Sequence, residues 1–280
     1  AYVYNYANLR ERYALLRGAN WSQSEKKIYF KYRYFLNFEE TDLSSFDPYI
    51  DYMLNYLSEQ SLDSSNYYFK TKQNTDFNIK RLKIVENNII GRELKNNLAR
   101  AIAYDEILNF DNHSQHENFL QYYFAVNSNT RFLGEVLSLH NDIKKMNVGS
   151  ILPRIFIQNS KLDTISSNEI LNKKPTIIYF WSQTQINQYK KTLKVIEKIK
   201  IKKPEYRFVG ISIQPLNKMV LKVNEMLGLD KKDQYAIINF ENASKKWIIT
   251  LLNKSIILDS NGNIVNGFAN IFDLELLNEL

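Results

Sequence analysis

The hydrophobic residues of this chain change their spacing near its middle, and this change restricts the possible fold more than any other feature. Up to about residue 146 they recur at helical intervals, as in Leu9, Tyr13 and Leu16, which fall on one face of a helix. Further along they gather into short continuous runs rich in β-branched and aromatic residues. We therefore expect an all-helical domain over residues 1–146 and an α/β domain over residues 147–280.

Local signals place several helices in the first half. Ser22 and Glu25 have the spacing of a capping box, which predicts a helix that runs to about Phe38. A long amphipathic helix is expected over residues 77–108, with a bend at Gly91 because glycine weakens a helix interior by about 1 kcal/mol. Further helices are expected behind Asp47-Pro48 and over residues 115–126 and 130–145.

The second half alternates predicted strands and helices. Residues 176–181 (TIIYFW) form an apolar run that is typical of a strand buried on both faces. Ser260-Asn261-Gly262 predicts a hairpin turn, because glycine accepts the positive φ that such turns need. This order of elements indicates a partly parallel sheet. The other expected elements are strands over 207–213, 235–240, 255–259 and 263–268, and helices over 186–202, 216–227 and 272–280.

Composition excludes several classes of site. The chain has no cysteine, so it cannot build disulfides, thiolate nucleophiles, zinc–cysteine sites or iron–sulfur clusters. The net charge of +7 is spread along the chain without dense arginine and aromatic clusters, and we expect no nucleic-acid partner. No apolar run approaches the ~20 residues of a membrane helix. With no P-loop or dinucleotide fingerprint, we expect no cofactor.

Three segments of the second half, taken in order, resemble the thioredoxin-like domains of the TlpA/ResA type. They are GSILPRIFIQN from residue 149, KKPTIIYFWS from residue 173 and KSIILDSNGNIV from residue 254. They are similar to the family's lead-in strand, to the strand before its active site and to its C-terminal hairpin. The resemblance runs from about Val148 to the end of the chain. It implies a thioredoxin-like C-terminal domain behind the helical one.

The chain departs from this family at the active site. When Phe180 and Trp181 are laid on the family's motif, Gln185 and Gln188 stand where its two cysteines would be. Asn253 takes the place of its cis-proline, and we expect a trans peptide bond there. Disulfide exchange needs a thiolate of low pKa at a helix N-terminus, and a glutamine amide cannot replace it. The resemblance thus implies a vestigial active-site edge at Trp181, Gln185, Gln188 and Asn253, with no catalytic residue.

The order of a helical domain and a thioredoxin-like domain is similar to that of proteins common in Bacteroidetes. Those proteins are mostly periplasmic or outer-membrane lipoproteins, so the resemblance implies a place in the cell envelope and a lipid anchor upstream of residue 1. We expect a redox-inactive protein that acts by binding a protein or peptide, as an accessory or scaffold subunit. The chain starts like mid-domain sequence, which indicates an upstream part.

Two alternatives stay open at this stage. His113 and His116, with Asp111 and Glu117 nearby, have a spacing that can bind a metal ion, although Ser114 and Glu117 also fit a capping box with both histidines on an exposed first turn. The second alternative is an enzyme that uses non-thiol chemistry in a cleft between the two domains. The sequence shows no convergent set of acid, base and nucleophile, and a cleft that holds His140, a carboxylate and a group of strongly shifted pKa would support this alternative.

Overall fold

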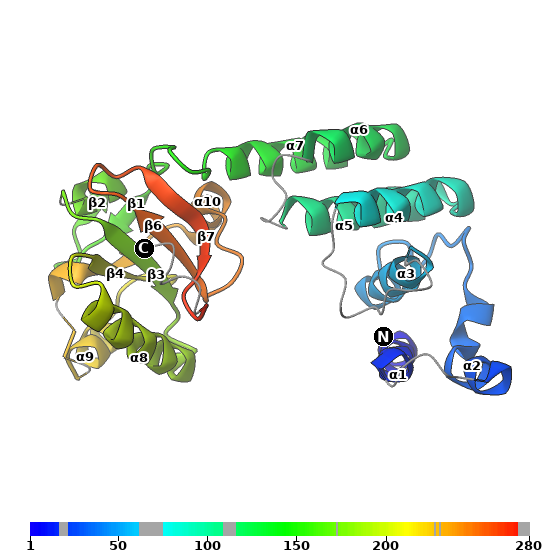
Figure 1. Ribbon diagram of the computed structural model, residues 1–280, viewed down its shortest axis with the longest axis horizontal. Helices are drawn as coiled ribbons and strands as arrows, with labels where there is room; N and C mark the ends of the chain where they lie inside the picture. Colours follow the sequence, from blue (N-terminus) through cyan, green and yellow to red (C-terminus); the bar gives the residue numbers. More distant parts are fainter. Residues whose placement is uncertain are drawn as a thin grey trace. The chain divides into compact units, whose positions relative to one another are not determined.

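The computed structural model describes residues 1–16, 22–61, 75–108, 116–171, 173–226, 228–229 and 231–273. Clustering of the chain into compact parts gives two units, residues 1–138 and 139–280 (Figure 1). The first unit is helical, and the second is built on a mixed sheet. The fold class expected from the sequence is therefore confirmed. The boundary between residues 146 and 147 stays a prediction about where two separately folding domains meet.

Helices make up the described secondary structure of the first unit. The last of them, α7, starts in this unit and continues to residue 144. The described elements are α1 (Tyr2–Leu16), α2 (Gln23–Tyr29), the 3₁₀ helix η1 (Lys31–Phe35), α3 (Asp47–Gln60), α4 (Thr75–Asn88), α5 (Arg92–Ile107), α6 (His116–Val126) and α7 (Thr130–Lys144).

The helix expected from residue 22 to Phe38 is shorter than predicted. Its start is correct, because the Ser22 backbone N–H donates to Glu25 Oε2 at 2.8 Å and the Glu25 N–H donates to Ser22 Oγ at 3.3 Å. After Tyr29 the chain tightens into η1. Arg33 lies in this turn, where its guanidinium forms ion pairs with Glu11 and Glu59. These contacts with α1 and α3 favour the tighter turn over a continued α-helix.

The long helix expected over residues 77–108 is two helices, α4 and α5. The break lies at Gly91, which is the N-cap of α5 and has extended backbone angles. The N–H groups of Ile90 and Gly91 both donate to the carbonyl of Phe38 at 3.1 Å. A Cβ on Gly91 would lie 3.1 Å from the carbonyl carbon of Glu39, so this close approach needs glycine. The backbone contact with Phe38 therefore ends one helix and starts another, where the sequence predicted only a bend.

α1 packs through a different face from the one that its large apolar residues define. Leu9 and Tyr13 are exposed, whereas Ala7, Glu11 and Ala14 are buried. Glu11 accepts a hydrogen bond of 2.5 Å from Tyr52 Oη in α3. Small residues and one buried carboxylate thus bring α1 close to α3, while Leu9 and Tyr13 face outward.

The second unit is organised around a sheet with strand order β2-β1-β5-β4-β3-β6-β7. β3, β4 and β5 are parallel, and every other neighbouring pair is antiparallel. The strands are β1 (Phe156–Gln158), β2 (Thr164–Ser166), β3 (Thr176–Trp181), β4 (Arg207–Ser212), β5 (Gln234–Ile237), β6 (Lys254–Leu258) and β7 (Ile264–Asn270). The helices are η3 (Ser167–Ile170), α8 (Ile186–Lys202), α9 (Lys218–Met226), η4 (Lys231–Asp233) and α10 (Phe240–Trp247).

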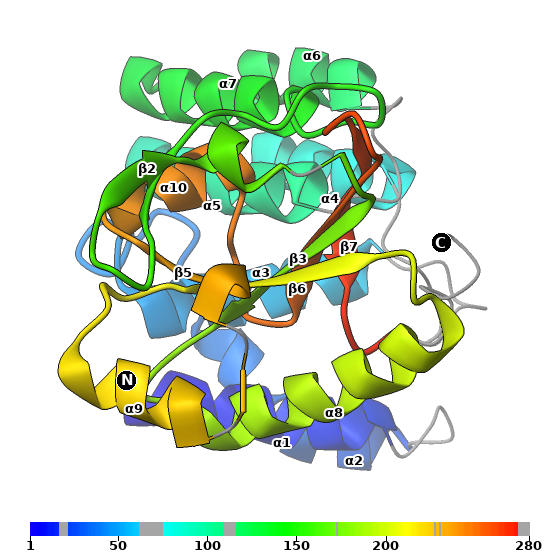
Figure 2. The ribbon, with the colours of Figure 1, turned by 90° about the vertical axis from the view of Figure 1, so that its left-hand side faces the viewer.

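Helices cover both faces of this sheet. Ile177, Tyr179 and Trp181 of β3 form a buried cluster with residues of α8 and α9. Phe180, which alternates with them, packs against Trp247 of α10 at a ring-centroid distance of 6.1 Å. α8 and α9 thus lie on one face and α10 on the other (Figure 2). Coverage of both faces explains why the TIIYFW run is apolar at every position.

The predicted hairpin is confirmed, and one helix was missed. Gly262 has φ +86°, and the N–H groups of Asn261 and Asn263 donate to Asp259 Oδ1 at 2.8 Å. The strand expected over residues 235–240 ends at Ile237 and is followed by α10, which sequence analysis did not predict. Its signals were local: Asn239 caps the helix, and Glu241 pairs with Lys245 at i, i+4. Most of the expected helix over residues 272–280 lies outside the described residues.

Candidate functional site

Three loops meet where the parallel strand β3 ends. Residues 182–185 follow β3, and residues 213–217 follow its parallel neighbour β4, so both loops leave the same edge of the sheet. β6 runs antiparallel to β3 with Tyr179 opposite Ser255, which brings residues 249–253 to this edge as well. We call these three loops and the first turn of α8 the α8 edge. It is the place where ligands bind in many α/β sheets.

The two glutamines predicted from sequence both belong to the first turn of α8. Gln185 is exposed and is the N-cap of α8, but its side chain makes no capping hydrogen bond. Gln188 is half-buried, and its Nε2 donates to the carbonyl oxygen of Leu252 at 3.3 Å. Its Oε1 is buried and has no hydrogen-bond partner. The amide of Gln188 therefore ties the start of α8 to the loop that precedes β6.

Asn253 is the residue that follows Leu252, whose carbonyl accepts the hydrogen bond from Gln188. The peptide bond before Asn253 is trans, as expected from the sequence. Its carbonyl accepts a hydrogen bond of 2.8 Å from the Ile271 N–H, next to β7. The structure thus brings Gln185, Gln188 and Asn253 to one edge, although they lie far apart in the sequence.

Trp181 does not belong to the exposed part of this edge. Its side chain is fully buried, and its ring stacks on that of Tyr189 in α8. The indole N–H has no hydrogen-bond partner in the described part of the chain. Trp181 therefore acts as a core residue beneath α8 and cannot touch a ligand at the surface.

A polar network at the α8 edge was missed by the sequence analysis. Gln214, behind β4, donates from Nε2 to Ser182 Oγ at 2.9 Å and accepts from the Gln183 N–H at 3.0 Å. Gln183 Nε2 donates to the Pro215 carbonyl at 2.8 Å. The available signal was that polar residues lie within two positions of the ends of two predicted strands, as Ser182, Gln183 and Gln214 do. The network locks the loop after β3 to the loop after β4.

Lys254, which opens β6, supports the edge from behind. Its ammonium donates to the carbonyls of Trp247 and Ile248 at the end of α10 and lies 4.5 Å from the centroid of the Phe268 ring. Burial lowers the pKa of Lys254 well below its usual value, because loss of hydration penalises the charged ammonium. Lys254 thus caps α10 and fixes the start of the loop that carries Asn253.

The connection of these elements defines the fold of the C-terminal unit. β3, α8 and β4 form a parallel β–α–β unit, and the antiparallel hairpin of β6 and β7 adds to the other side of β3. The C-terminal unit has a thioredoxin-like fold. The correspondence of its α8 edge with the two-cysteine site of thioredoxin-like enzymes, which the resemblance implies, stays a prediction, and this chain has no cysteine at all.

No family model and no curated protein matches the sequence. Among the similar solved structures is a protein described as a thiol-disulfide oxidoreductase from Bacteroides vulgatus, with 19% identity over 48% of this chain and 96% of that one and a TM-score of 0.38. A C-terminal domain of such a protein from Bacteroides thetaiotaomicron has 23% identity over 48% and 93%, with a TM-score of 0.38. A thioredoxin-like protein from Bacteroides caccae has 11% identity over 87% and 88%, with a TM-score of 0.47.

The groups gathered at the α8 edge are suited to hydrogen bonding. Among the described residues, Ser182 Oγ has only uncharged partners, which are the Gln214 amide, the Thr184 N–H and the Thr184 hydroxyl. No acid or base therefore activates this hydroxyl by direct contact. Thiol–disulfide exchange requires a thiolate, which this thioredoxin-like unit cannot supply. What the edge offers is amides and the N-terminus of α8, both of which bind peptide carbonyls.

The candidate metal site stays a prediction. His113 lies outside the described residues, and His116 is buried at the start of α6, contrary to the exposed first turn that a capping box suggested. Within the described part of the chain, no group of three or more histidine and carboxylate side chains could hold a metal ion. His140 is buried in α7. An interdomain site around it likewise stays a prediction. No helix among the described residues is long and apolar enough to cross a membrane.

Proposed function

We propose that this protein is a redox-inactive member of the cell-envelope machinery that acts by binding, as an accessory or scaffold subunit. The observation that carries the proposal is the state of the α8 edge. It has no thiols, yet Gln188, Gln183 and Gln214 hold its loops together by side-chain hydrogen bonds. These hydrogen bonds hold the loops in fixed positions, which favours a preformed binding surface.

The proposed ligand of this edge is an extended stretch of polypeptide. Gln185 leaves the N–H groups at the start of α8 without a side-chain cap, so a peptide carbonyl can bind there. Leu251, in the neighbouring loop, is 65% exposed and offers an apolar contact beside these donors. Donors for a backbone next to an apolar side chain are a common arrangement in peptide recognition.

A photo-crosslinking amino acid tests the proposal in the native envelope. It replaces Gln185 at the α8 edge, and in a matched control it replaces Ile201, an exposed residue at the other end of the same helix. We expect discrete crosslinked products from position 185 and none of the same mass from position 201. Equal patterns from both positions, or none from position 185, would contradict a binding role for this edge.

The location and the lack of redox activity need separate tests. Fractionation of cells that express the full-length protein should place it in the periplasm or at the outer membrane, and recovery in the cytoplasm would overturn the envelope assignment. In an insulin-reduction assay the purified protein should show no turnover above the blank. Turnover that survives in the absence of contaminating thiol proteins would overturn the redox-inactive part of the proposal.

A further inference from the structure

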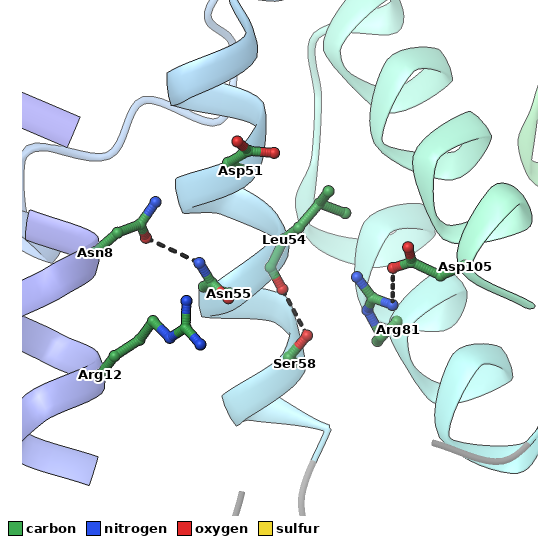
Figure 3. Close-up of a pocket in the computed structure, with 8 residues that line it drawn as sticks. All are labelled: Asn8, Arg12, Asp51, Leu54, Asn55, Ser58, Arg81 and Asp105. Carbon is green, nitrogen blue, oxygen red and sulfur yellow. Dashed lines mark hydrogen bonds and ion pairs between the residues drawn. The ribbon is translucent and has the colours of Figure 1, made fainter. Parts of the chain in front are cut away.

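A polar cavity opens within the helical unit, separate from the α8 edge. Its volume of about 320 Å³ lies within the usual range of ligand pockets. α1, α3, α4 and α5 each contribute to its walls (Figure 3). The side chains on which the argument depends are Asn8, Arg12, Asp51, Asn55, Arg81 and Asp105.

Arg81 brings a buried positive charge to the wall of this cavity. Its side chain is 2% exposed, and Nη1 donates to Asn78 Oδ1 at 3.0 Å and to Asp105 Oδ2 at 2.8 Å. Nε is buried and has no hydrogen-bond partner among the described residues, and Figure 3 shows the second terminal nitrogen directed toward α3. A guanidinium that directs a terminal nitrogen into a polar cavity favours the binding of a carboxylate there.

A second arginine faces the same cavity from α1. Arg12 is exposed, and no ion pair joins it to another described residue. The position of α1 is held by a hydrogen bond of 3.0 Å from Asn55 Nδ2 to Asn8 Oδ1, which lies in the cavity wall. Two positive side chains on different helices thus face one polar space.

The opposite charge comes from α3 and α5. Asp51 lines the cavity with Asp105, and no described cation forms an ion pair with Asp51. Partial burial and the neighbouring charges of Asp47 and Asp105 raise the pKa of the Asp51 carboxyl. An added cation at this point would relieve the repulsion between these carboxylates.

We propose that this cavity binds a small zwitterion, an α-amino acid or a short peptide, with its carboxylate toward Arg81 and Arg12 and its ammonium group toward Asp51. The two arginines match the negative charge of such a ligand, and the carboxylate of Asp51 matches its positive charge. The inference is independent of the function proposed for the α8 edge, because it concerns only residues of the helical unit.

Calorimetric titration of the full-length protein with four small probes tests the charge requirement. L-alanine and L-alanyl-L-alanine carry both charges, propionate lacks the ammonium group, and ethylamine lacks the carboxylate. We expect binding of at least one zwitterion, and at least about tenfold weaker binding of propionate and ethylamine, since each loses one charge-assisted interaction. Comparison of the two dissociation constants shows whether the cavity prefers a free amino acid or a peptide.

The test substitutions are made at two exposed residues, so that they leave the fold intact. Arg12→Ala should weaken the binding of L-alanine and its dipeptide by about tenfold, and Asp51→Asn should remove the preference for L-alanine over propionate. Arg131→Ala, at another exposed arginine of the helical unit, is the matched control and should change neither. Propionate binding as tightly as both zwitterions, or no binding of either zwitterion at millimolar concentration, would overturn the proposal.

Discussion

Trp181 and Tyr189 stack face to face, with ring centroids 4.3 Å apart and an angle of 7° between the rings. Tyr189 Oη lies 3.3 Å from both Asn224 Oδ1 and Gln234 Oε1 and can donate to either of them. The indole N–H of Trp181 is buried without a partner among the described residues. The pair joins β3 to α8 inside the unit. Trp181 therefore supports the α8 edge from within the core.

Replacement of Trp181 tests this packing role. Trp181→Ala should lower the free energy of unfolding by about 3–5 kcal/mol, because it leaves a cavity beneath α8. Trp181→Phe should cost clearly less, since it keeps an aromatic ring and removes an unpaired N–H. Urea unfolding followed by circular dichroism measures both.

Trp247 is the matched control, because it is also fully buried but its indole N–H donates to the Pro153 carbonyl at 2.6 Å. Trp247→Phe should therefore destabilise the protein by about 1 kcal/mol more than Trp181→Phe. The reverse order would show that the unpaired N–H of Trp181 is not a cost.

Gln188 should stabilise the loop before β6. Gln188→Leu removes the hydrogen bond to the Leu252 carbonyl, and we expect a loss of about 1 kcal/mol together with faster amide exchange in residues 249–254. Lys190→Ala, at an exposed position of the same helix, should change the free energy of unfolding by less than about 0.5 kcal/mol. If amide exchange in Gln188→Leu is unchanged, the hydrogen bond of Gln188 does not stabilise the loop before β6.

A pair of introduced cysteines tests the alignment of Gln185 and Gln188 with the two family cysteines. The double variant Gln185→Cys/Gln188→Cys places two thiols one helical turn apart, at i and i+3. A thiol-reactive mass tag should label both sites in the reduced protein. After mild oxidation it should label neither site in the monomer, because the two thiols have formed an intramolecular disulfide. Oxidation only to disulfide-linked dimers would place the two side chains on different faces.

The buried lysine makes stability depend on pH. Because the pKa of Lys254 is lowered in the folded state, the unfolded chain binds more protons between that pKa and 10.5. The free energy of unfolding should therefore rise with pH in this window. It should fall above about pH 10, since burial raises the pKa of Tyr179 to about 12 while the same tyrosine ionises earlier in the unfolded chain.

Lys254→Met separates these two effects. Urea unfolding of the variant between pH 7 and about pH 9 should lose the rise with pH that the unmodified protein shows. The fall above about pH 10 should remain, because the buried tyrosines are unchanged. A rise that persists in Lys254→Met would assign it to another group.

The sequence pattern alone predicted those features whose interactions join residues close together in the chain. The turn at Asp259 and Gly262 closes through hydrogen bonds within five residues, and the TIIYFW run needs only burial on both faces. The capping box of Ser22 and Glu25 is equally local. The same holds for the absence of thiols, which follows from composition alone.

Tertiary structure decided what depends on contacts between distant segments. The break at Gly91 requires the Phe38 carbonyl, and the tether of Gln188 reaches 64 residues along the chain to Leu252. The cavity of Arg12, Arg81 and Asp51 exists only because four helices pack around it. Periodicity states which face of a segment is apolar, but it cannot state which partner that face meets, because packing is a property of the assembled chain.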